Sequence, residues 1–439
     1  MGEVSLELRD VVARAMERER VPGVAWGVLE AGATTTGALG VTSVAHPLPV
    51  DADTLFQVGS ITKTVTATAI VRLEDAGRLR VNERVRAYVP DLQLADRAAA
   101  DALTLRHLLT HTAGLTGDWY CTTGSGEDAV AQAVARLSEL EQVMPPGRHY
   151  SYCNPGFVLL GRVIELVTGT PYHVAVRELV LGPAGMSRAT FLPVEAMTER
   201  FAAGHSAGPS SVEVVRPWTT QRMMMPAGGL ISSVNDLLAY ARHHLEDSAL
   251  ARMREPLVES GGQSDAVGLA WAIRDVRGTR VVSHGGDLRG QASLLVLVPQ
   301  RGLAFAIVAN AQTGHSVIAD AYRGLLASLD LAAEPTPAID HDLAEYAGRY
   351  TASISDLDIT LAGDALVVRT TLKQLVPGSL TTFPDPPPSR LRAYAPDRLI
   401  GVDGPLKDAR VEAVRGDDGR VAWLRLGGRI RKRVSGTTV

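Results

Sequence analysis

Ser60 and Lys63 lie three residues apart in the segment 56–65, FQVGSITKTV, and together could do covalent chemistry. Four of the chain's 44 basic residues are lysines, and none of the other three comes before residue 373. A serine hydroxyl becomes a good nucleophile only beside a base. Arginine keeps its proton in proteins, whereas burial can lower the pKa of a lysine until it releases one. The pair therefore favours Ser60 as nucleophile and Lys63 as its base, although a lysine that stays charged would instead orient groups and stabilise an oxyanion.

A Ser-x-x-Lys pair alone occurs by chance in many sequences, so a second motif matters. The segment 145–161, PPGRHYSYCNPGFVLLG, places Tyr152 and Asn154 between a Pro-Pro-Gly turn and a predicted helix. A phenol near a lysine can pass a proton to and from Ser60, and Asn154 can hold Lys63 or a substrate amide. The plainer interpretation is a packed tyrosine followed by a helix cap. Tyr150 competes for the tyrosine role, but Tyr152 and not Asn stands two residues after it.

A third motif lies in the segment 281–291, VVSHGGDLRGQ. His284, Gly285 and Gly286 end a predicted edge strand, where glycines let a substrate backbone lie close. The backbone N–H of Asp287 can then join that of Ser60 as an oxyanion hole. A tight hairpin with an exposed histidine is the alternative.

These motifs need a scaffold, and hydrophobic periodicity predicts one. From residue 60 to 77, apolar residues recur every four positions, which predicts a helix that carries both Ser60 and Lys63 on one face. From about residue 268 the period changes to that of adjacent antiparallel strands. The other predicted elements are a helix over 6–21, a strand pair over 24–32 and 35–43, helical patterns between 85 and 225, strands at 280–286, 292–298 and 303–311, and a closing helix over 315–329.

The last hundred residues differ from the rest. Residues 330–342, DLAAEPTPAIDHD, indicate a linker. Beyond it the sequence is rich in strand patterns and contains Asp-Gly turn signals at 403–404 and 418–419. We therefore expect a separate small β domain, a barrel or a strongly curved sheet.

The order Ser-x-x-Lys, Tyr-x-Asn, His-x-Gly resembles the serine β-lactamase and penicillin-binding-protein superfamily, in its class C-like branch. The segments LTLRHLLTHTAGL, PAGGLISSVNDLLAYA and ASLLVLVPQRGLAFAIVANA also resemble that branch, and the resemblance covers about residues 5–330. It implies Ser60 as nucleophile, Lys63 and Tyr152 as base and proton shuttle, and Asn154 and His284 as contacts to the substrate and transition state. Gly286 and Asp287 are expected to join those contacts.

The resemblance also implies a fold and domain limits. We expect an α/β domain, with an antiparallel sheet flanked by helices, that clasps an all-helical domain. The catalytic region spans 1–335, with its α/β part at about 1–85 and 225–335 and its helical part at about 86–224. A lipocalin-like, all-β barrel domain at 340–439 follows, as in some members.

Two departures from the family pattern bear on the substrate. Class C β-lactamases and D,D-peptidases usually have a lysine that binds a substrate carboxylate where this chain has His284. A histidine there is typical of the esterases, aminopeptidases and acyltransferases of the branch. Asp287 and Arg289 follow where many relatives have small residues, so the pocket is expected to be particular to this chain.

Cys153 is interpreted as a small residue that points away from the cleft.

Composition and charge exclude several other classes of protein. The net charge of −4 and the pI of about 6.3 give no electrostatic basis for binding nucleic acid or an anionic membrane. The first residues show no signal peptide and no apolar run is long enough to span a bilayer. Cys121 and Cys153 do not have a metal-ligand spacing. We expect a cytoplasmic protein without metal or cofactor.

Three functions remain in competition. The favoured one is a transacylase that passes the acyl group of a small metabolite's ester or amide to an amine or alcohol in natural-product biosynthesis. An esterase or D-amino-acid amidase or peptidase would hydrolyse the same intermediate. A non-catalytic acyl-ligand sensor on the same fold is the alternative from another class, and the three intact motifs count against it. Cell-wall processing or β-lactam resistance would need export and is disfavoured by His284.

Overall fold

The computed structural model describes residues 3–119, 121–208, 211–219, 221–262, 264–332, 336–373 and 385–434. Its largest feature is an eight-stranded sheet of order β2-β1-β12-β11-β10-β9-β8-β7, in which neighbouring strands run antiparallel. Strands from both ends of this region meet in the sheet, where β1 pairs with β12. The strands are β1 (Gly23–Glu30), β2 (Ala33–Gly40), β7 (Val258–Glu259), β8 (Ala266–Val267), β9 (Ala272–Val276), β10 (Thr279–Leu288), β11 (Gln291–Val298) and β12 (Leu303–Ala309).

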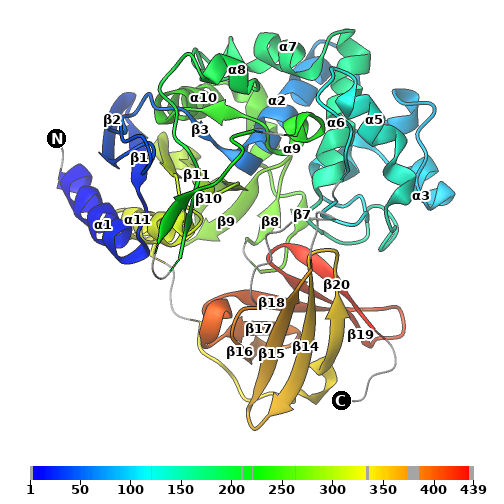
Figure 1. Cartoon of the computed structure of the whole chain (residues 1–439). Coiled ribbons are helices and arrows are strands. Elements are labelled where there is room, and N and C mark those ends of the chain that lie inside the picture. Colours follow the sequence, from blue (N-terminus) through cyan, green and yellow to red (C-terminus); the bar gives the residue numbers. More distant parts are fainter. Residues whose placement is uncertain are drawn as a thin grey trace.

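Helices cover both faces of this sheet (Figure 1). One core cluster joins α1 (Glu3–Glu19) and α11 (Gly314–Ser328) to one face. The other face packs on α10 (Val234–Glu246) and α2 (Thr62–Asp75), in a second and larger cluster. Strands that are buried on both faces have nearly continuous apolar sequences, and every residue of β12, LAFAIVA, is indeed buried.

A helical region lies beyond α2, which is buried on nearly all sides. Its threonines satisfy their hydroxyls inside the core: Thr66, for example, bonds both Tyr172 Oη at 2.8 Å and the carbonyl of Pro226 at 2.6 Å. The helices of this region are α3 (Arg97–Ala102), α4 (Leu105–Leu109), α5 (Ala129–Ala135), α6 (Asn154–Thr168), α7 (Tyr172–Val176), α8 (Pro193–Ala196) and α9 (Met225–Gly228). Two short pairs complete it, β3 (Phe56–Gln57) with β6 (Ile231–Ser232) and β4 (His205–Ala207) with β5 (Val212–Val214).

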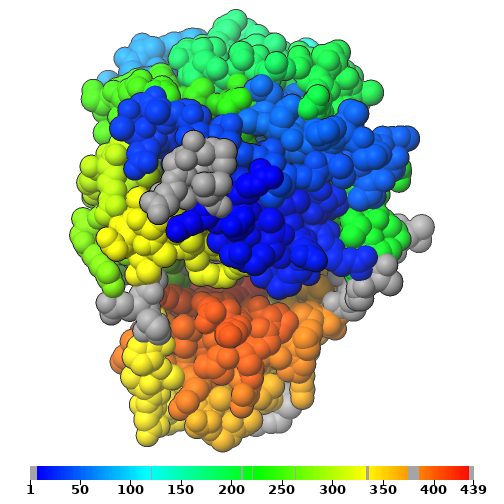
Figure 2. Space-filling view, turned by 90° about the vertical axis from the view of Figure 1, so that its left-hand side faces the viewer, coloured from blue at the N-terminus to red at the C-terminus, as the bar shows by residue number. Residues whose placement is uncertain are grey.

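The C-terminal part forms a closed barrel with its own core. Figures 1 and 2 show it packed beneath the larger body. The turn between β19 and β20 reaches up to the helical region, where the N–H of Tyr152 donates to the carbonyl of Gly428 at 2.8 Å. Its strands are β13 (Gly348–Thr351), β14 (Ser355–Ala362), β15 (Ala365–Leu372), β16 (Ser389–Ala395), β17 (Arg398–Gly401), β18 (Arg410–Arg415), β19 (Val421–Leu426) and β20 (Arg429–Arg433).

The predicted fold class is confirmed: an antiparallel sheet flanked by helices, with a helical region and a β barrel. The domain limits at 335 and 340 stay predictions, and residues 333–335 of the predicted linker lie outside the described ones. The prediction that His284 ends an edge strand is wrong, since β10 lies inside the sheet between β9 and β11. However, β9 pairs with β10 only as far as Ser283, so the following residues pair on one side only. Of the described helices, none has the length and hydropathy to cross a membrane.

Candidate active site

Ser60 stands in a short 3-10 turn, η1 (Gly59–Ile61), immediately before α2 begins at Thr62. Lys63 is in the first turn of α2 and is fully buried. Its Nζ lies 3.1 Å from Ser60 Oγ and donates to the carbonyl of Ala227 at 2.5 Å. The sequence spacing of three residues thus brings the two groups into hydrogen-bonding contact, as predicted from helical geometry.

The surroundings of Lys63 disfavour its charged form. Burial, and next the guanidinium of Arg429, hold the pKa of Lys63 well below its ordinary value, while Asp118 and Cys153 act in the opposite direction. Burial of this kind favours the neutral form of a lysine, which can accept a proton. The geometry therefore allows Lys63 Nζ to take the proton of Ser60 Oγ, which an arginine could not do.

Tyr152 is a neighbour of both Lys63 and Ser60. Lys63 Nζ sits 4.9 Å from the centroid of its ring. Burial raises the pKa of Tyr152, and a hydrogen bond with the Ser60 side chain opposes that rise. The phenol therefore keeps its proton at neutral pH and can donate it. The rival Tyr150 instead contacts Arg425 and the edge of His111, and burial raises its pKa to about 12.

His284 approaches the same group of side chains from β10. Its side chain is buried, and its ring centroid is 6.2 Å from that of Tyr152. Burial, and next the charge of Lys63, lower the pKa of His284 to about 4. The ring Nδ1 is 2.7 Å from the carbonyl of Gly285, which can only accept, so Nδ1 carries the proton. The neutral imidazole then has Nε2 free of a proton, as an acceptor.

The turn that holds Ser60 and the free side of β10 approach each other closely. A Cβ on Gly59, which has a φ of 51°, would lie 2.7 Å from the backbone nitrogen of Asp287. A Cβ on Gly286 would lie 2.0 Å from the carbonyl oxygen of Val58 and 3.0 Å from the nitrogen of Ser60. The structure thus places Gly286 against this turn, and its contact with the substrate stays a prediction.

The backbone nitrogens of Ser60 and Asp287 are the two donors predicted for an oxyanion hole, and this close approach brings the two backbone segments that carry them together. The carboxylate of Asp287 is exposed and pairs with His315 at the start of α11, with Oδ2 2.5 Å from Nε2. Its backbone, rather than its side chain, therefore lies next to the nucleophile.

Asn154 is the first residue of α6, and its role as a substrate contact stays a prediction. Its Nδ2 donates to Asp118 Oδ1 at 2.9 Å, and the described contacts include none from its side chain to Lys63. Asp118 in turn accepts two hydrogen bonds from Arg429 of the barrel, one of them at 2.8 Å. The guanidinium of Arg429 lies 4.9 Å from the ring centroid of Tyr152.

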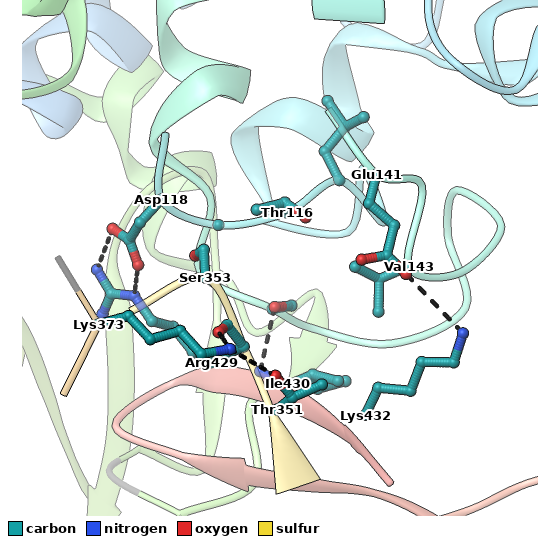
Figure 3. Close-up of a pocket in the computed structure, with 14 residues that line it drawn as sticks. Thr116, Asp118, Glu141, Val143, Thr351, Ser353, Lys373, Arg429, Ile430 and Lys432 are labelled. Atoms are coloured by element: carbon teal, nitrogen blue, oxygen red, sulfur yellow. Dashed lines mark hydrogen bonds and ion pairs between the residues drawn. The ribbon is translucent and has the colours of Figure 1, made fainter. Parts of the chain in front are cut away.

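A cavity of about 260 Å³ opens between the helical region and the barrel (Figure 3). The Asp118–Arg429 pair stands at one end of it. A second pair, Glu141 with Lys432 at 3.8 Å, stands at the other end. Arg429 lines this cavity and also contacts the ring of Tyr152, so the cavity lies next to the reaction centre. The two are nevertheless separate spaces.

Sequence reasoning missed Asp118, His111 and the position of Arg429. The run GGRIRKR at 427–433 was the only signal for Arg429, and a basic run is more often a solvated surface. His111 stacks on Tyr152 with ring centroids 4.4 Å apart.

The thiol of Cys153 is buried, which raises its pKa to about 12 and makes it unreactive, in keeping with our interpretation of it. The described residues contain no cluster of metal-ligating side chains.

Comparison with known proteins decides the family. The family model described as Beta-lactamase matches residues 8–329. The chain belongs to the beta-lactamase family. It is a serine hydrolase or acyltransferase of this type. Penicillin-binding protein 4 of Amycolatopsis lactamdurans is 32% identical to it over 358 residues, which cover 75% of this chain and 93% of that protein.

Solved structures have a similar fold. The crystal structure of SurE superposes with a TM-score of 0.78 and 27% identity, over 99% of this chain and 100% of SurE. SurE has also been solved with D-Leu, with a TM-score of 0.76 and 25% identity over the same shares of the two chains. A beta-lactamase/D-alanine carboxypeptidase from Pseudomonas syringae has a TM-score of 0.65 and 21% identity over 76% of this chain and all of that one. At 21% identity, the similarity to this Pseudomonas syringae protein shows only that the fold is shared.

Proposed function

We propose that the protein is a serine acyl-enzyme catalyst that transfers the acyl group of a small metabolite's ester or amide to an amine or alcohol, in natural-product biosynthesis. The observation that carries this proposal is the contact of 3.1 Å between Lys63 Nζ and Ser60 Oγ. The burial that lowers the pKa of Lys63 supports it, because a neutral amine is needed to activate the serine.

In the first half-reaction, Ser60 Oγ attacks the acyl carbonyl carbon and its proton passes to Lys63 Nζ. The carbonyl oxygen becomes an oxyanion between the N–H groups of Ser60 and Asp287. The bond to the leaving group then breaks, and Tyr152 donates the proton that the leaving group takes. Lys63 restores the proton of Tyr152, which leaves an ester on Ser60.

In the second half-reaction, the nitrogen or oxygen of the acceptor attacks this ester. Its proton passes to the neutral Lys63, and Ser60 Oγ leaves and is reprotonated from that lysine. Transfer and hydrolysis differ only in whether the acceptor or water attacks, so the ratio of products is a ratio of two rates on one intermediate.

Two names among the relatives suggest the class of acyl group. SurE has been solved with D-Leu, and the relative from Amycolatopsis lactamdurans is called a penicillin-binding protein. We propose that the acyl donor or the acceptor of this protein carries a D-amino-acid residue. The same observation favours the second candidate function, hydrolysis of a D-amino-acid amide or ester.

The first test is covalent capture. A fluorophosphonate, and separately a fluorescent penicillin, are incubated with the full chain, and the modified peptide is identified by mass spectrometry. We expect one adduct on Ser60. Labelling of Cys153 in its place would refute the nucleophile assignment, and the absence of any adduct with a panel of activated esters would favour the acyl-ligand sensor.

The second test separates transfer from hydrolysis. Activated esters of acetyl-D-leucine and acetyl-L-leucine are incubated with the full chain, with and without a series of amines and alcohols. We expect faster turnover of the D-ester and diversion of product from acid to amide or ester as the acceptor concentration rises. If free acid is the only product with every acceptor, the protein is an esterase or amidase and the proposed acyl transfer is wrong.

We also propose a cytoplasmic location. Its support is that Cys121 and Cys153 are both free in the structure, as expected in a reducing compartment. Immunodetection in fractionated cells of the native host would test this.

A further inference from the structure

The loop that carries Tyr152 is held by the barrel. Three consecutive residues of the loop each contact the β19–β20 hairpin through the backbone or a short side chain. The carbonyl of Tyr150 accepts from Arg425 Nε at 3.0 Å, Ser151 Oγ accepts from the N–H of Ile430 at 3.2 Å, and the N–H of Tyr152 donates to the carbonyl of Gly428 at 2.8 Å.

We propose that the hairpin of the C-terminal barrel is part of the catalytic machinery, and that Arg429 is a positioning residue which fixes the phenol of Tyr152 beside Lys63 and Ser60. This inference rests on the proposed function, in which Tyr152 relays a proton. It assigns a task to a domain that the catalytic motifs do not include.

The geometry around Arg429 supports this role. Its guanidinium covers the Tyr152 ring at 4.9 Å from the centroid and is fixed by two hydrogen bonds to Asp118, which is largely buried. Asp118 also accepts from Asn154, the first residue of α6. A planar fork bound to one carboxylate holds its plane against an aromatic face, which a lysine cannot do.

The same ring also has a neighbour from the helical region. His111 stacks on Tyr152, its Nδ1 accepts from the N–H of Cys153 at 3.0 Å, and its carbonyl accepts from the N–H of Ser151 at 2.8 Å. His111 belongs to the helical region and Arg429 to the barrel. Both regions therefore contact the tyrosine ring, and loss of the barrel would remove the contact from Arg429 and leave that from His111.

Arg429 has an electrostatic effect that a purely structural contact would not have. Its charge lowers the pKa of Lys63, and the charge of Asp118 raises it. The other titratable groups around Lys63 are Cys153 before α6, Tyr152, His111 after α4, and His284 on β10. None of these carries a permanent charge near neutral pH, because burial raises the pKa of the thiol and phenol and lowers that of both imidazoles.

The experiment compares the full-length wild type with three single variants, two at Arg429 and one at Asp118. Arg429→Ala should lower kcat about 10²-fold with a small change in KM, since a misplacement of about 1 Å in a reacting group has that effect. It should also shift the acidic limb of the kcat/KM profile to higher pH, because a cation beside Lys63 is lost. Arg429→Lys should keep the limb in place but recover only part of kcat. Asp118→Asn should shift the limb to lower pH.

The matched control is Asp417→Ala. Asp417 pairs with Arg148 across the same boundary between barrel and helical region, is 90% exposed, and is remote from the site residues in its contacts. This variant should leave kcat and the pH profile unchanged. If it lowers kcat as much as Arg429→Ala does, attachment of the barrel alone explains the effect and the proposal is wrong.

Other outcomes are equally decisive. Wild-type turnover in Arg429→Ala, or an acidic limb that moves in the same direction in Arg429→Ala and Asp118→Asn, would refute the proposal. If a single variant fails to fold, the double change Asp118→Leu with Arg429→Met removes both charges together, and we expect it to fold with low kcat. Failure of the fluorophosphonate to label Ser60 in the wild type would instead refute the proposed function, so the two failures are distinguishable.

Discussion

Lys63 shows how one residue type can be required by chemistry in a chain whose basic residues are mostly arginines. It is fully buried next to Ser60 Oγ, and its lowered pKa suits a base. We expect Lys63→Arg to lose about 10²–10⁴-fold in turnover, close to the loss in Lys63→Ala, because neither variant supplies a group that accepts a proton. Steady-state kinetics with an activated ester measure this. An arginine variant with most of the wild-type activity would mean that position 63 needs only a cation.

The same burial has a consequence for stability. In the unfolded chain Lys63 binds its proton at any pH below its ordinary value of 10.5, whereas the folded chain binds it only below the lowered pKa. Between those two values the unfolded state holds more protons, so stability decreases as the pH falls. Lys63→Met removes this penalty and should therefore gain more stability relative to wild type at pH 8 than at pH 10.5.

Denaturant unfolding of both proteins at the two pH values checks this prediction. The comparison between them cancels the titration of all other groups. A difference in the free energy of unfolding that is the same at both pH values would show that the lysine titrates alike in the folded and unfolded chain.

Tyr152 and Tyr150 are two buried phenols in one loop, and only Tyr152 contacts Lys63 and Ser60. Tyr152→Phe keeps the ring and its contacts with His111 and Arg429 but removes the hydroxyl, so we expect a loss of about 10²-fold or more in turnover with little loss of stability. Tyr150→Phe is the matched control. If kinetics show that Tyr150→Phe is the impaired variant, the assignment of the motif is wrong by two residues.

At the scale of elements, the site depends on how closely β10 approaches the turn at Ser60. Gly286→Ala would place a methyl group 2.0 Å from the carbonyl oxygen of Val58 and 3.0 Å from the nitrogen of Ser60. Backbone atoms cannot yield as a flexible side chain can, so we expect a loss of about 1–3 kcal/mol in the free energy of unfolding. Turnover should fall as well, because the two oxyanion donors move apart.

Gly285→Ala is the matched control for this change. The nearest atom to a Cβ at Gly285 lies at 3.6 Å, which is an ordinary contact. Thermal unfolding and kinetics of the two variants together test the assignment, and equal behaviour of the two would contradict it.

Local patterns predicted the elements well and their pairing less well. The period of apolar residues located α2, α11 and the central strands, and the Asp-Gly signals fall at Gly404 and Gly419, which have φ values of 64° and 76°. The interior position of β10 could not be predicted, because β7, β8 and β9 are short and add only a few residues beyond it. Ser60, Lys63, Tyr152 and His284 were found by their residue types, whereas Asp118 and Arg429 need the fold to meet, since they are 311 residues apart.

At the scale of the whole molecule, the barrel and the catalytic region share one active-site loop. The buried contact through Arg429 and Asp118 joins them next to Tyr152, and exposed pairs such as Arg148 with Asp417 join them elsewhere. Exposed pairs contribute little stability, typically 0–1 kcal/mol. The buried contacts of the hairpin should therefore dominate both the docking of the barrel and its effect on catalysis.

Deletion of residues 340–439 tests this view. The truncated chain loses the cover over Tyr152, so we expect lower turnover and, because water gains access to the acyl-Ser60 ester, a larger share of free acid at a fixed amine concentration. Product analysis of the truncated and full chains measures both effects, and fluorophosphonate labelling of Ser60 reports whether the shortened chain is folded. A truncated chain that labels normally, with the turnover and product ratio of the full chain, would show that the barrel plays no part in the reaction.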